Sequence, residues 1–296
     1  MLSGPTASGK SDLAVALAQA FDAEIVGADS RQIYRDMPIG TAAPTPEQLA
    51  LVPHHLVGFL DPQQRYSAAQ FSEEATAAIA AIHARGKRAI VTGGTGFYIR
   101  ALTGAVVLAP QYEPALRERL AHEARSHDRQ FLYEWLRVRD PRRAASVHPQ
   151  DSYRVLRALE VALAPRDAVR RAGAVPTLQS MQIPFAKVFI DIEQPELDAR
   201  IAKRTEAMLD AGLIDEAQRV GNDAVAASAV GYPQANAFLR GWLTRDELRA
   251  LLIRATRRYA KRQITWFRAE PQTQWVSASV ALERLAALAR EKLRWA

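Results

Sequence analysis

The segment that most restricts the fold of this chain is Gly4-Pro5-Thr6-Ala7-Ser8-Gly9-Lys10-Ser11. We call it the phosphate loop, because glycine, four residues and then Gly-Lys-Ser is typical of a loop whose backbone N–H groups surround a polyphosphate. The lysine would place its charge at the outer phosphate oxygens, and the serine would offer its hydroxyl to Mg²⁺. The Ala- and Leu-rich segment 12–21 predicts a helix whose N-terminal dipole faces the same anion. This pattern predicts an α/β fold built on a parallel sheet.

Only Met1-Leu2-Ser3 precede the phosphate loop, although such a loop normally follows a buried apolar strand. We expect the start of the chain to lie further upstream, because losing a strand buried on both faces would leave a costly void. The alternative is that the central strand is absent. A run of apolar codons upstream and in frame would support the first interpretation.

The composition allows one large α/β domain with an insertion, or two domains, within 296 residues. No apolar run approaches membrane-spanning length and the N-terminus lacks a signal-peptide layout, so we expect a soluble cytoplasmic protein with no membrane association. The chain has no cysteine, which excludes disulfides and thiolate zinc sites. The net charge of +7 is compatible with a polyanionic partner and equally with a solvated basic surface.

Asp29 follows the next predicted strand, residues 23–28. Ligands of parallel sheets bind beyond the carboxyl ends of the strands, so a carboxylate there can accept a proton or hold the water shell of a metal. Aspartate is also a common helix cap, and position alone does not separate these roles. A further strand, residues 87–92, leads to Gly93-Gly94-Thr95-Gly96-Phe97-Tyr98, which we call the glycine-rich loop. Such a turn allows close approach of the backbone to a ligand, and we expect it at the same sheet edge as Asp29 and the phosphate loop.

Residues 38–62 carry many prolines and predict a loop region that encloses a short strand near His54 and His55. Neighbouring residues of a strand point to opposite sides, so these two histidines are not expected to share a zinc ion. Ser67 and Gln70 have capping-box spacing and predict the start of a helix that Gly86 ends.

The strand signal disappears between residues 112 and 181, which predicts a charged helical insertion. A phosphate backbone is the partner that so many arginines favour, although a solvated face is the simpler alternative. The arginines of this segment include Arg117, Arg119, Arg125, Arg137, Arg139, Arg142, Arg143, Arg154 and Arg157.

A buried strand is predicted again at residues 186–192, followed by a helix from Pro195 to Gly212. Arg200 and Arg204 lie four residues apart and therefore on one side of this helix. They could reach a shared anion, or they could form an ordinary exposed pair.

A capping box at Thr244 and Glu247 predicts a long helix with five cations on one stripe and no acid between them. Like charges so close repel unless something neutralises them, which favours an anionic partner. We call these residues the basic stripe; they are Arg254, Arg257, Arg258, Lys261 and Arg262. Trp266 and Phe267 follow as a stacking platform or as a core anchor, and a short strand at residues 274–276 and an amphipathic helix end the chain.

Together these segments resemble the tRNA dimethylallyltransferases, and the resemblance covers nearly the whole chain. The matching segments are residues 4–11, 28–34, 53–56, 66–68, 93–98, 157–161, 229–232 and 256–263. The resemblance implies a P-loop NTPase-like parallel sheet flanked by helices, with an all-helical insertion domain. We therefore expect a first core part at residues 1–110, a tRNA-binding insertion at 111–183, and a second core part at 184–296. Because the chain has no cysteine, it has no C-terminal zinc finger of the thiolate type, and in this respect it resembles the bacterial members of the family. We expect a monomer.

By this resemblance, dimethylallyl diphosphate would donate its dimethylallyl group to N6 of the adenosine 3′ of the anticodon, in the anticodon stem-loop of tRNA. Asp29 matches the general base of the family, and Mg²⁺, held by Ser11, is the expected cofactor. The family has a diphosphate-contacting arginine in the helix of Arg200 and Arg204, and either residue fits. The expected diphosphate-binding residues are Gly4, Thr6, Ala7, Ser8, Gly9, Lys10 and Ser11.

The resemblance further implies that Asp29, Ser30, Arg31 and Gln32 hold the edge of an adenine that has left its stack. The other positions that match tRNA contacts are Thr95, Arg117, Gln150, Asp151, Ser152, Tyr153, Arg154, Arg257, Arg258, Lys261 and Arg262. Cations on a helix would hold backbone phosphates and give affinity rather than sequence choice.

One position and one segment depart from the family. Pro233 stands where a basic or polar residue is expected, and residues 165–179 differ from the usual turn after residues 157–161. Three other functions use part of the same pattern: a small-molecule kinase, a prenyltransferase of free adenine nucleotides, and a non-catalytic RNA-binding switch. The kinase has no use for the basic stripe, the nucleotide prenyltransferase has little use for the charged insertion, and the switch has no use for Asp29.

Overall fold

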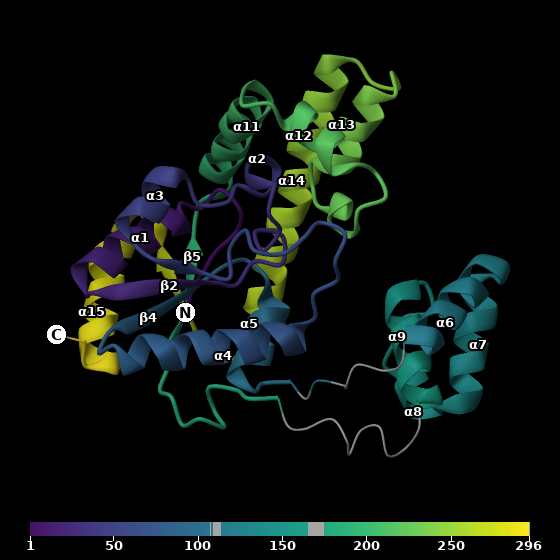
Figure 1. Ribbon diagram of the computed structural model, residues 1–296, viewed down its shortest axis with the longest axis horizontal. Helices are drawn as coiled ribbons and strands as arrows, with labels where there is room; N and C mark the ends of the chain where they lie inside the picture. Colours follow the sequence, from purple (N-terminus) through teal and green to yellow (C-terminus); the bar gives the residue numbers. More distant parts are fainter. Residues whose placement is uncertain (107, 109–113, 165–174, 296) are drawn as a thin grey trace. The chain divides into compact units, whose positions relative to one another are not determined.

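The computed structural model describes residues 1–106, 108, 114–164 and 175–295, which fall into two compact units (Figure 1). The first unit joins Met1–Val106 to Pro176–Ala296, and the second is Val107–Val175. The expected insertion, residues 111–183, therefore ends too late. Residues 176–183 belong to the first unit, where the Leu178 N–H donates to the Leu102 carbonyl (2.8 Å). They form no helix or strand, so the sequence pattern gave no sign of this boundary. Of the unusual stretch 165–179, residues 165–174 lie outside the described residues.

A parallel sheet runs through the first unit in the order β3-β2-β4-β1-β5-β6. Its strands are β1 (Leu2–Ser3), β2 (Ala23–Gly27), β3 (His54–His55), β4 (Arg88–Thr92), β5 (Lys187–Asp191) and β6 (Thr273–Ser277). The central strand is thus present, but it has only two residues. Leu2 pairs with Thr92 on one side and with Val188 on the other, so β1 occupies the position in which a phosphate loop needs its strand.

Helices cover both faces of this sheet (Figure 1). On one face, α1 (Lys10–Ala20) and α15 (Ala281–Leu293) pack on a cluster that includes Ile25, Ile90 and Ile190. Side chains alternate along a strand, so Phe189 points to the opposite face. There it meets Phe267 of α14 (Arg245–Arg268), with ring centroids 4.8 Å apart. Phe267 is therefore a core residue, which agrees with the second of the two predicted roles, core anchor rather than stacking platform.

The predicted helix starts are confirmed at two capping boxes. Ser67 and Gln70 cap α4 (Ala68–Ala84), and Thr244 and Glu247 cap α14. The region 38–62 does contain the expected strand, but it also contains α2 (Pro38–Thr41) and α3 (Pro46–Leu51), which were not predicted. A proline begins each of these short helices, a position where its missing N–H costs nothing.

His54 and His55 have separate partners: the first bonds the Val52 carbonyl, and Nε2 of the second lies 2.7 Å from a Glu24 carboxylate oxygen. Within the residues that the structure describes, no group of three or more His, Cys, Asp or Glu is arranged to hold a metal. No helix in this part of the chain combines the length and the apolar character that crossing a membrane requires.

The second unit consists, where it is described, of α6 (Pro114–Ser126), α7 (Arg129–Arg139), α8 (Pro141–Ala145) and α9 (Ser152–Leu163). Leu132, Leu136 and Leu159 form the centre of its core. The remaining helices of the first unit are α5 (Gly96–Thr103), α11 (Gln194–Asp210), α12 (Leu213–Val220) and α13 (Tyr232–Leu239).

Candidate active site

A cavity of about 750 Å³ lies in the first unit beyond the carboxyl ends of β1 and β2, and we call it the site cavity. The phosphate loop, the segment after β2, and the helices α11 and α14 contribute its walls. The predicted site residues that line it are Thr6, Ala7, Gly9, Lys10, Ser11, Asp29, Ser30, Arg31, Gln32, Arg200, Arg204 and Arg262. The structure therefore brings five of the seven predicted diphosphate-binding residues to one place with Asp29.

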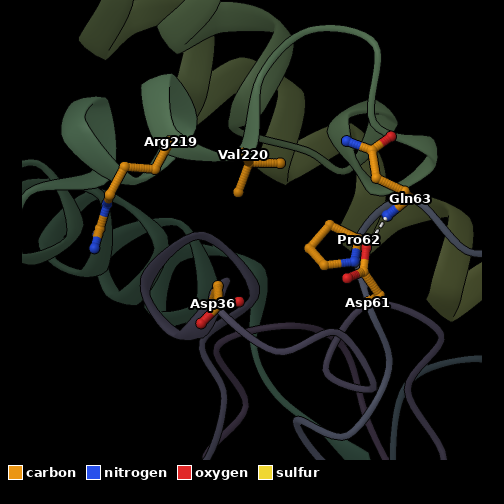
Figure 2. A pocket seen from close by; sticks show the side chains of 6 residues that line it. All are labelled: Asp36, Asp61, Pro62, Gln63, Arg219 and Val220. Atoms are coloured by element: carbon orange, nitrogen blue, oxygen red, sulfur yellow. Dashed lines mark hydrogen bonds between the residues drawn. The ribbon is translucent and has the colours of Figure 1, made fainter.

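A smaller hollow of about 330 Å³ is lined by Asp36, Pro62, Arg219 and other side chains drawn in Figure 2. It contains none of the predicted site residues. Its carboxylate Asp61 accepts hydrogen bonds from the Gln63 N–H (2.9 Å) and from the Arg35 side chain (2.6 Å), which hold a turn.

The phosphate loop has the geometry that its glycines predict. Gly9 has a φ of 83°, in the left-handed region, and it directly precedes α1. A Cβ atom at Gly4 would lie 2.7 Å from Oγ of Ser8. Gly4 and Ser8 are themselves buried and do not line the site cavity, so they shape the loop from behind.

Lys10 is held in a partly desolvated position at the start of α1. Burial lowers the pKa of its ammonium group to about 8, the negative charge of Asp29 opposes this shift, and the positive charge of Arg204 adds to it. An anion that binds beside such a lysine stabilises its charged form, and this stabilisation makes the binding of the anion more favourable.

Arg200 and Arg204 both reach the phosphate loop from α11, as their spacing predicts, but in different ways. Arg204 donates to Oγ1 of Thr6 (2.6 Å), and burial lowers the pKa of its guanidinium against the opposing charge of Asp29. Arg200 donates to the Ser8 carbonyl (3.2 Å) and is paired with Glu196 (2.6 Å). Its positive charge is therefore already neutralised within its own helix.

Asp29 stands two residues beyond β2, and its Oδ1 accepts the N–H of Arg31 (2.9 Å). The aspartate thus stabilises a turn rather than capping a helix. The neighbouring Ser30 is fixed by Thr95, whose Oγ1 accepts the Ser30 N–H (2.9 Å) and donates to its Oγ (3.2 Å). Thr95, a predicted tRNA contact, does not line the site cavity and supports Ser30 from behind.

The glycines of the glycine-rich loop make room for protein atoms, which differs from our expectation of a ligand. A Cβ atom at Gly94 would lie 2.0 Å from Nε2 of Gln263, and one at Gly96 would lie 2.0 Å from Nε1 of Trp266. The cause is the close passage of α14, which a reading of the loop alone does not contain.

Sequence reasoning missed Gln263, which joins two loops of the site. Its Oε1 accepts the N–H of Thr6 (2.8 Å), and its Nε2 donates to the Gly94 carbonyl (3.1 Å). The residue ended one of the matching segments, 256–263, but the helical pattern gave no sign of these bonds. Tyr259 of the same helix also lines the site cavity, with the Arg262 guanidinium 5.6 Å from its ring centroid.

The basic stripe lies on α14 with all five side chains exposed. As predicted, no acid lies between these cations along the helix, but an acid from another helix pairs with one of them. Nε of Arg257 lies 2.8 Å from Oδ1 of Asp198, which belongs to α11. A reading along a single helix could not detect a partner from another helix. Arg258 and Lys261 remain exposed on the same helix.

In the second unit, Arg117 is committed to an internal ion pair. It lies 2.8 Å from the buried carboxylate of Glu160, which Arg157 also contacts at 2.5 Å. Asp151 caps α9 by accepting the Arg154 N–H (3.1 Å). These contacts explain the residue types without a ligand, so a tRNA contact at these positions stays a prediction.

The other predicted contacts of this unit lie at the start of α9. Tyr153 is 81% exposed, Ser152 is the first residue of the helix, and the Gln150 N–H donates to His148. Pro233, the departure noted above, is exposed in the first turn of α13, in the first unit.

Comparisons with known proteins agree with this arrangement. The family model described as IPP transferase matches residues 32–270, and the one described as isopentenyl transferase matches residues 1–58. A tRNA dimethylallyltransferase of Geobacter sulfurreducens is 40% identical over 294 residues, which are 98% of this chain and 94% of that protein. The crystal structure of the full-length tRNA isopentenylpyrophosphate transferase of Bacillus halodurans is 34% identical with a TM-score of 0.71, covering 99% of this chain and 95% of that one. A eukaryotic dimethylallyltransferase acting on tRNA is 25% identical with a TM-score of 0.76, covering 97% and 77%.

Proposed function

The chain belongs to the IPP transferase family, the tRNA dimethylallyltransferases, and we propose that it transfers a dimethylallyl group from dimethylallyl diphosphate to tRNA. The acceptor is N6 of the adenosine 3′ of the anticodon, and the reaction takes place in the cytoplasm on a monomeric enzyme. The observation that carries this proposal is the site cavity itself, where a phosphate loop and Asp29 lie together. The loop binds the diphosphate, and the carboxylate accepts a proton from the nucleophile that binds beside it.

The phosphate loop grips a leaving group rather than a nucleotide. As the allylic C1–O bond breaks, its electron pair moves to the diphosphate, whose negative charge therefore grows. Lys10 and the start of α1 line this part of the cavity, so they would stabilise the charge without reorganising. The lowered pKa of Lys10 supports this role, because the lysine is desolvated and lacks a full counter-charge.

Asp29 is the general base. The lone pair of an exocyclic adenine amine is delocalised into the ring, which makes N6 a poor nucleophile. A carboxylate that accepts an N6 hydrogen bond, and then its proton, lets N6 form the new bond to C1. The Arg31 N–H occupies Oδ1 of Asp29, so Oδ2 is the oxygen that we assign to the substrate.

Arg204 is the arginine that contacts the diphosphate, and Arg200 supports the loop. Arg204 bonds a loop side chain and is desolvated beside Asp29 and Lys10. Arg200 bonds a loop carbonyl, which no phosphate would approach, and its charge is balanced by Glu196. The partners of the two arginines therefore support the choice of Arg204 over Arg200.

The side chains of the cavity fit Mg²⁺. This ion keeps several waters and is usually held by one or two protein oxygens together with substrate phosphates, rather than by a cage of carboxylates. The Ser11 hydroxyl lines the site cavity next to Lys10 and would supply such an oxygen. Bound to the diphosphate, Mg²⁺ would neutralise part of the charge of the leaving group.

The acceptor adenine enters after leaving its stack, and Ser30, Arg31 and Gln32 line the cavity where its edge would bind. Gln32 uses its amide to hold the carbonyls of Thr41 (3.2 Å) and Ala42 (2.7 Å), so it also shapes this wall. The exposed cations of the basic stripe would hold backbone phosphates.

The direct test combines the protein with dimethylallyl diphosphate, Mg²⁺ and unmodified tRNA, followed by nucleoside mass spectrometry. We expect dimethylallyl-adenosine beside the anticodon, and no product from Lys10→Met. Transfer to free AMP but not to tRNA would instead identify a nucleotide prenyltransferase. Tight ATP binding with phosphoryl transfer and no prenyl product would identify a kinase.

A further inference from the structure

Gln263 lies on α14 with only 5% of its surface exposed, between two loops that are far apart in the sequence. Its side-chain carbonyl accepts the Thr6 N–H at 2.8 Å, and its side-chain NH₂ donates to the Gly94 carbonyl at 3.1 Å. One loop presents a donor and the other presents an acceptor. A primary amide satisfies both at once, whereas a carboxylate could not donate and an apolar side chain could do neither.

Each of these two loops leads to one half of the reaction. On the phosphate side, Oγ1 of Thr6 accepts the hydrogen bond of Arg204 at 2.6 Å. On the other side, Thr95 follows Gly94 and holds Ser30 through the Ser30 N–H at 2.9 Å. Ser30 in turn adjoins Asp29, and a Cβ atom at Gly94 would lie 3.8 Å from Oδ2 of Asp29. Gln263 thus stands where the diphosphate half and the base half of the cavity meet.

We propose that Gln263 is a positioning residue that fixes the distance between the phosphate loop and the glycine-rich loop, and with it the distance between the two substrates. This proposal rests on the proposed function, since only a reaction between a bound diphosphate and a bound amine needs that distance to be fixed. N6 must sit about 3 to 3.5 Å from C1, and a displacement of about 1 Å can lower a rate by about 100-fold.

The packing around Gln263 agrees with a fixed spacing. Any side chain at residue 94 would meet Nε2 of Gln263 at 2.0 Å, so the glycine is required for the amide to reach its carbonyl. The backbone of Gly94 has no positive φ, so alanine is sterically allowed there by its conformation and excluded only by Gln263. This makes Gly94→Ala a second way to disturb the same contact from the opposite end.

The test compares Gln263→Met, Gly94→Ala and the double variant with the matched control Phe267→Leu. Methionine has nearly the length of glutamine but makes neither hydrogen bond. Phe267 lies one turn further along α14, is equally buried and packs on Phe189, but bonds neither loop. Three quantities are measured well below the melting temperature: inorganic pyrophosphate affinity by calorimetry, tRNA affinity by filter binding, and the single-turnover transfer rate.

For Gln263→Met we expect a transfer rate lower by about 100-fold, pyrophosphate binding weaker by about 5-fold, and tRNA affinity within about 2-fold of the wild type. Gly94→Ala should slow transfer by about 10-fold or more, and the double variant should be no more than about 3-fold slower than Gln263→Met. The two losses do not add because both act on one contact. Phe267→Leu should lower the melting temperature and leave the rate within about 2-fold.

Additive losses in the double variant, or rates that follow melting temperature in all variants including Phe267→Leu, would overturn the proposal. If Gln263→Met does not fold, the comparison of Gly94→Ala with Phe267→Leu decides. Pyrophosphate binding needs no transfer, so it tests the loop spacing even if the wild-type protein makes no product. In that case the proposed function fails, while weakened binding of pyrophosphate by Gln263→Met alone still supports the role of Gln263 in holding the phosphate loop.

Discussion

Replacing each arginine of α11 in turn by glutamine separates direct stabilisation of the leaving group from support of the loop. The two residues stand one helical turn apart and both contact the phosphate loop. Arg204 bonds the Thr6 hydroxyl in a desolvated position near Lys10 and Asp29. Arg200 is 41% exposed at its side chain and already paired with Glu196. The same substitution at two neighbouring positions therefore has different expected results.

The expected magnitudes follow from these surroundings. Arg204→Gln removes a preorganised, charged hydrogen-bond donor from the place where charge develops, which costs about 100-fold to 1,000-fold in rate, or about 3 kcal/mol. Arg200→Gln removes an exposed ion pair, which contributes about 0.2 to 1 kcal/mol, and a hydrogen bond to the Ser8 carbonyl, but no group that we place on the diphosphate, so the rate should fall by no more than about 5-fold. The assay is single-turnover transfer to tRNA at saturating dimethylallyl diphosphate, with the affinity for pyrophosphate measured separately. Equal losses in the two variants, or the larger loss in Arg200→Gln, would refute the assignment.

Three further changes test other parts of the account. Because burial lowers the pKa of Lys10, its ammonium loses its proton as the pH rises through about 8, and the affinity for dimethylallyl diphosphate should fall over this range. Lys10→Arg keeps its charge and should not show this fall. Calorimetry at a series of pH values measures both affinities. Replacing Arg258 and Arg262 by alanine should weaken tRNA binding and reduce its salt dependence by up to about two in slope, and an unchanged slope in filter binding would remove α14 from the interface. Tyr232→Phe deletes a buried 2.7 Å hydrogen bond to the fully buried Glu216, whose carboxylate also accepts backbone N–H groups of α2. The substitution should lower the free energy of unfolding, measured by urea denaturation, by about 1.5 to 3 kcal/mol. A loss below about 0.5 kcal/mol would show that the bond is dispensable.

Local patterns predicted much of the fold and the centre of the site. The phosphate loop, the two capping boxes and Asp29 beyond β2 each depend on residues close in the sequence, and the structure has them as predicted. The same spacing argument placed Arg200 and Arg204 on one side of α11.

What the sequence did not contain were partners that only the fold brings together. Asp198 neutralises Arg257 from another helix, and Glu160 takes the charge of Arg117 from 43 residues away. Gln263 reaches Thr6 across 257 residues. No periodicity or motif encodes such pairs. The sequence therefore did not show that Arg257 of the basic stripe has an acidic partner, or that Gln263 bonds two loops of the site.

Boundaries failed for a related reason. The segment 176–183 has no regular structure, and its membership of the first unit depends on hydrogen bonds to α4 and α5 residues rather than on its own pattern. The two-residue β1 is too short for any strand signal, yet its neighbours β4 and β5 hold it at the centre of the sheet.

The most direct test of the account is the single-turnover rate of Asp29→Asn, measured together with its affinities for tRNA and pyrophosphate. Asparagine keeps the size and the acceptor for the Arg31 N–H but cannot take a proton from N6. Asp36→Asn, at an exposed aspartate that does not line the site cavity, is the matched control. We predict a transfer rate lower by about 100-fold to 10,000-fold, with both affinities within about 3-fold of the wild type. A normal transfer rate, or a loss confined to tRNA binding, would contradict the assignment of Asp29 as the base.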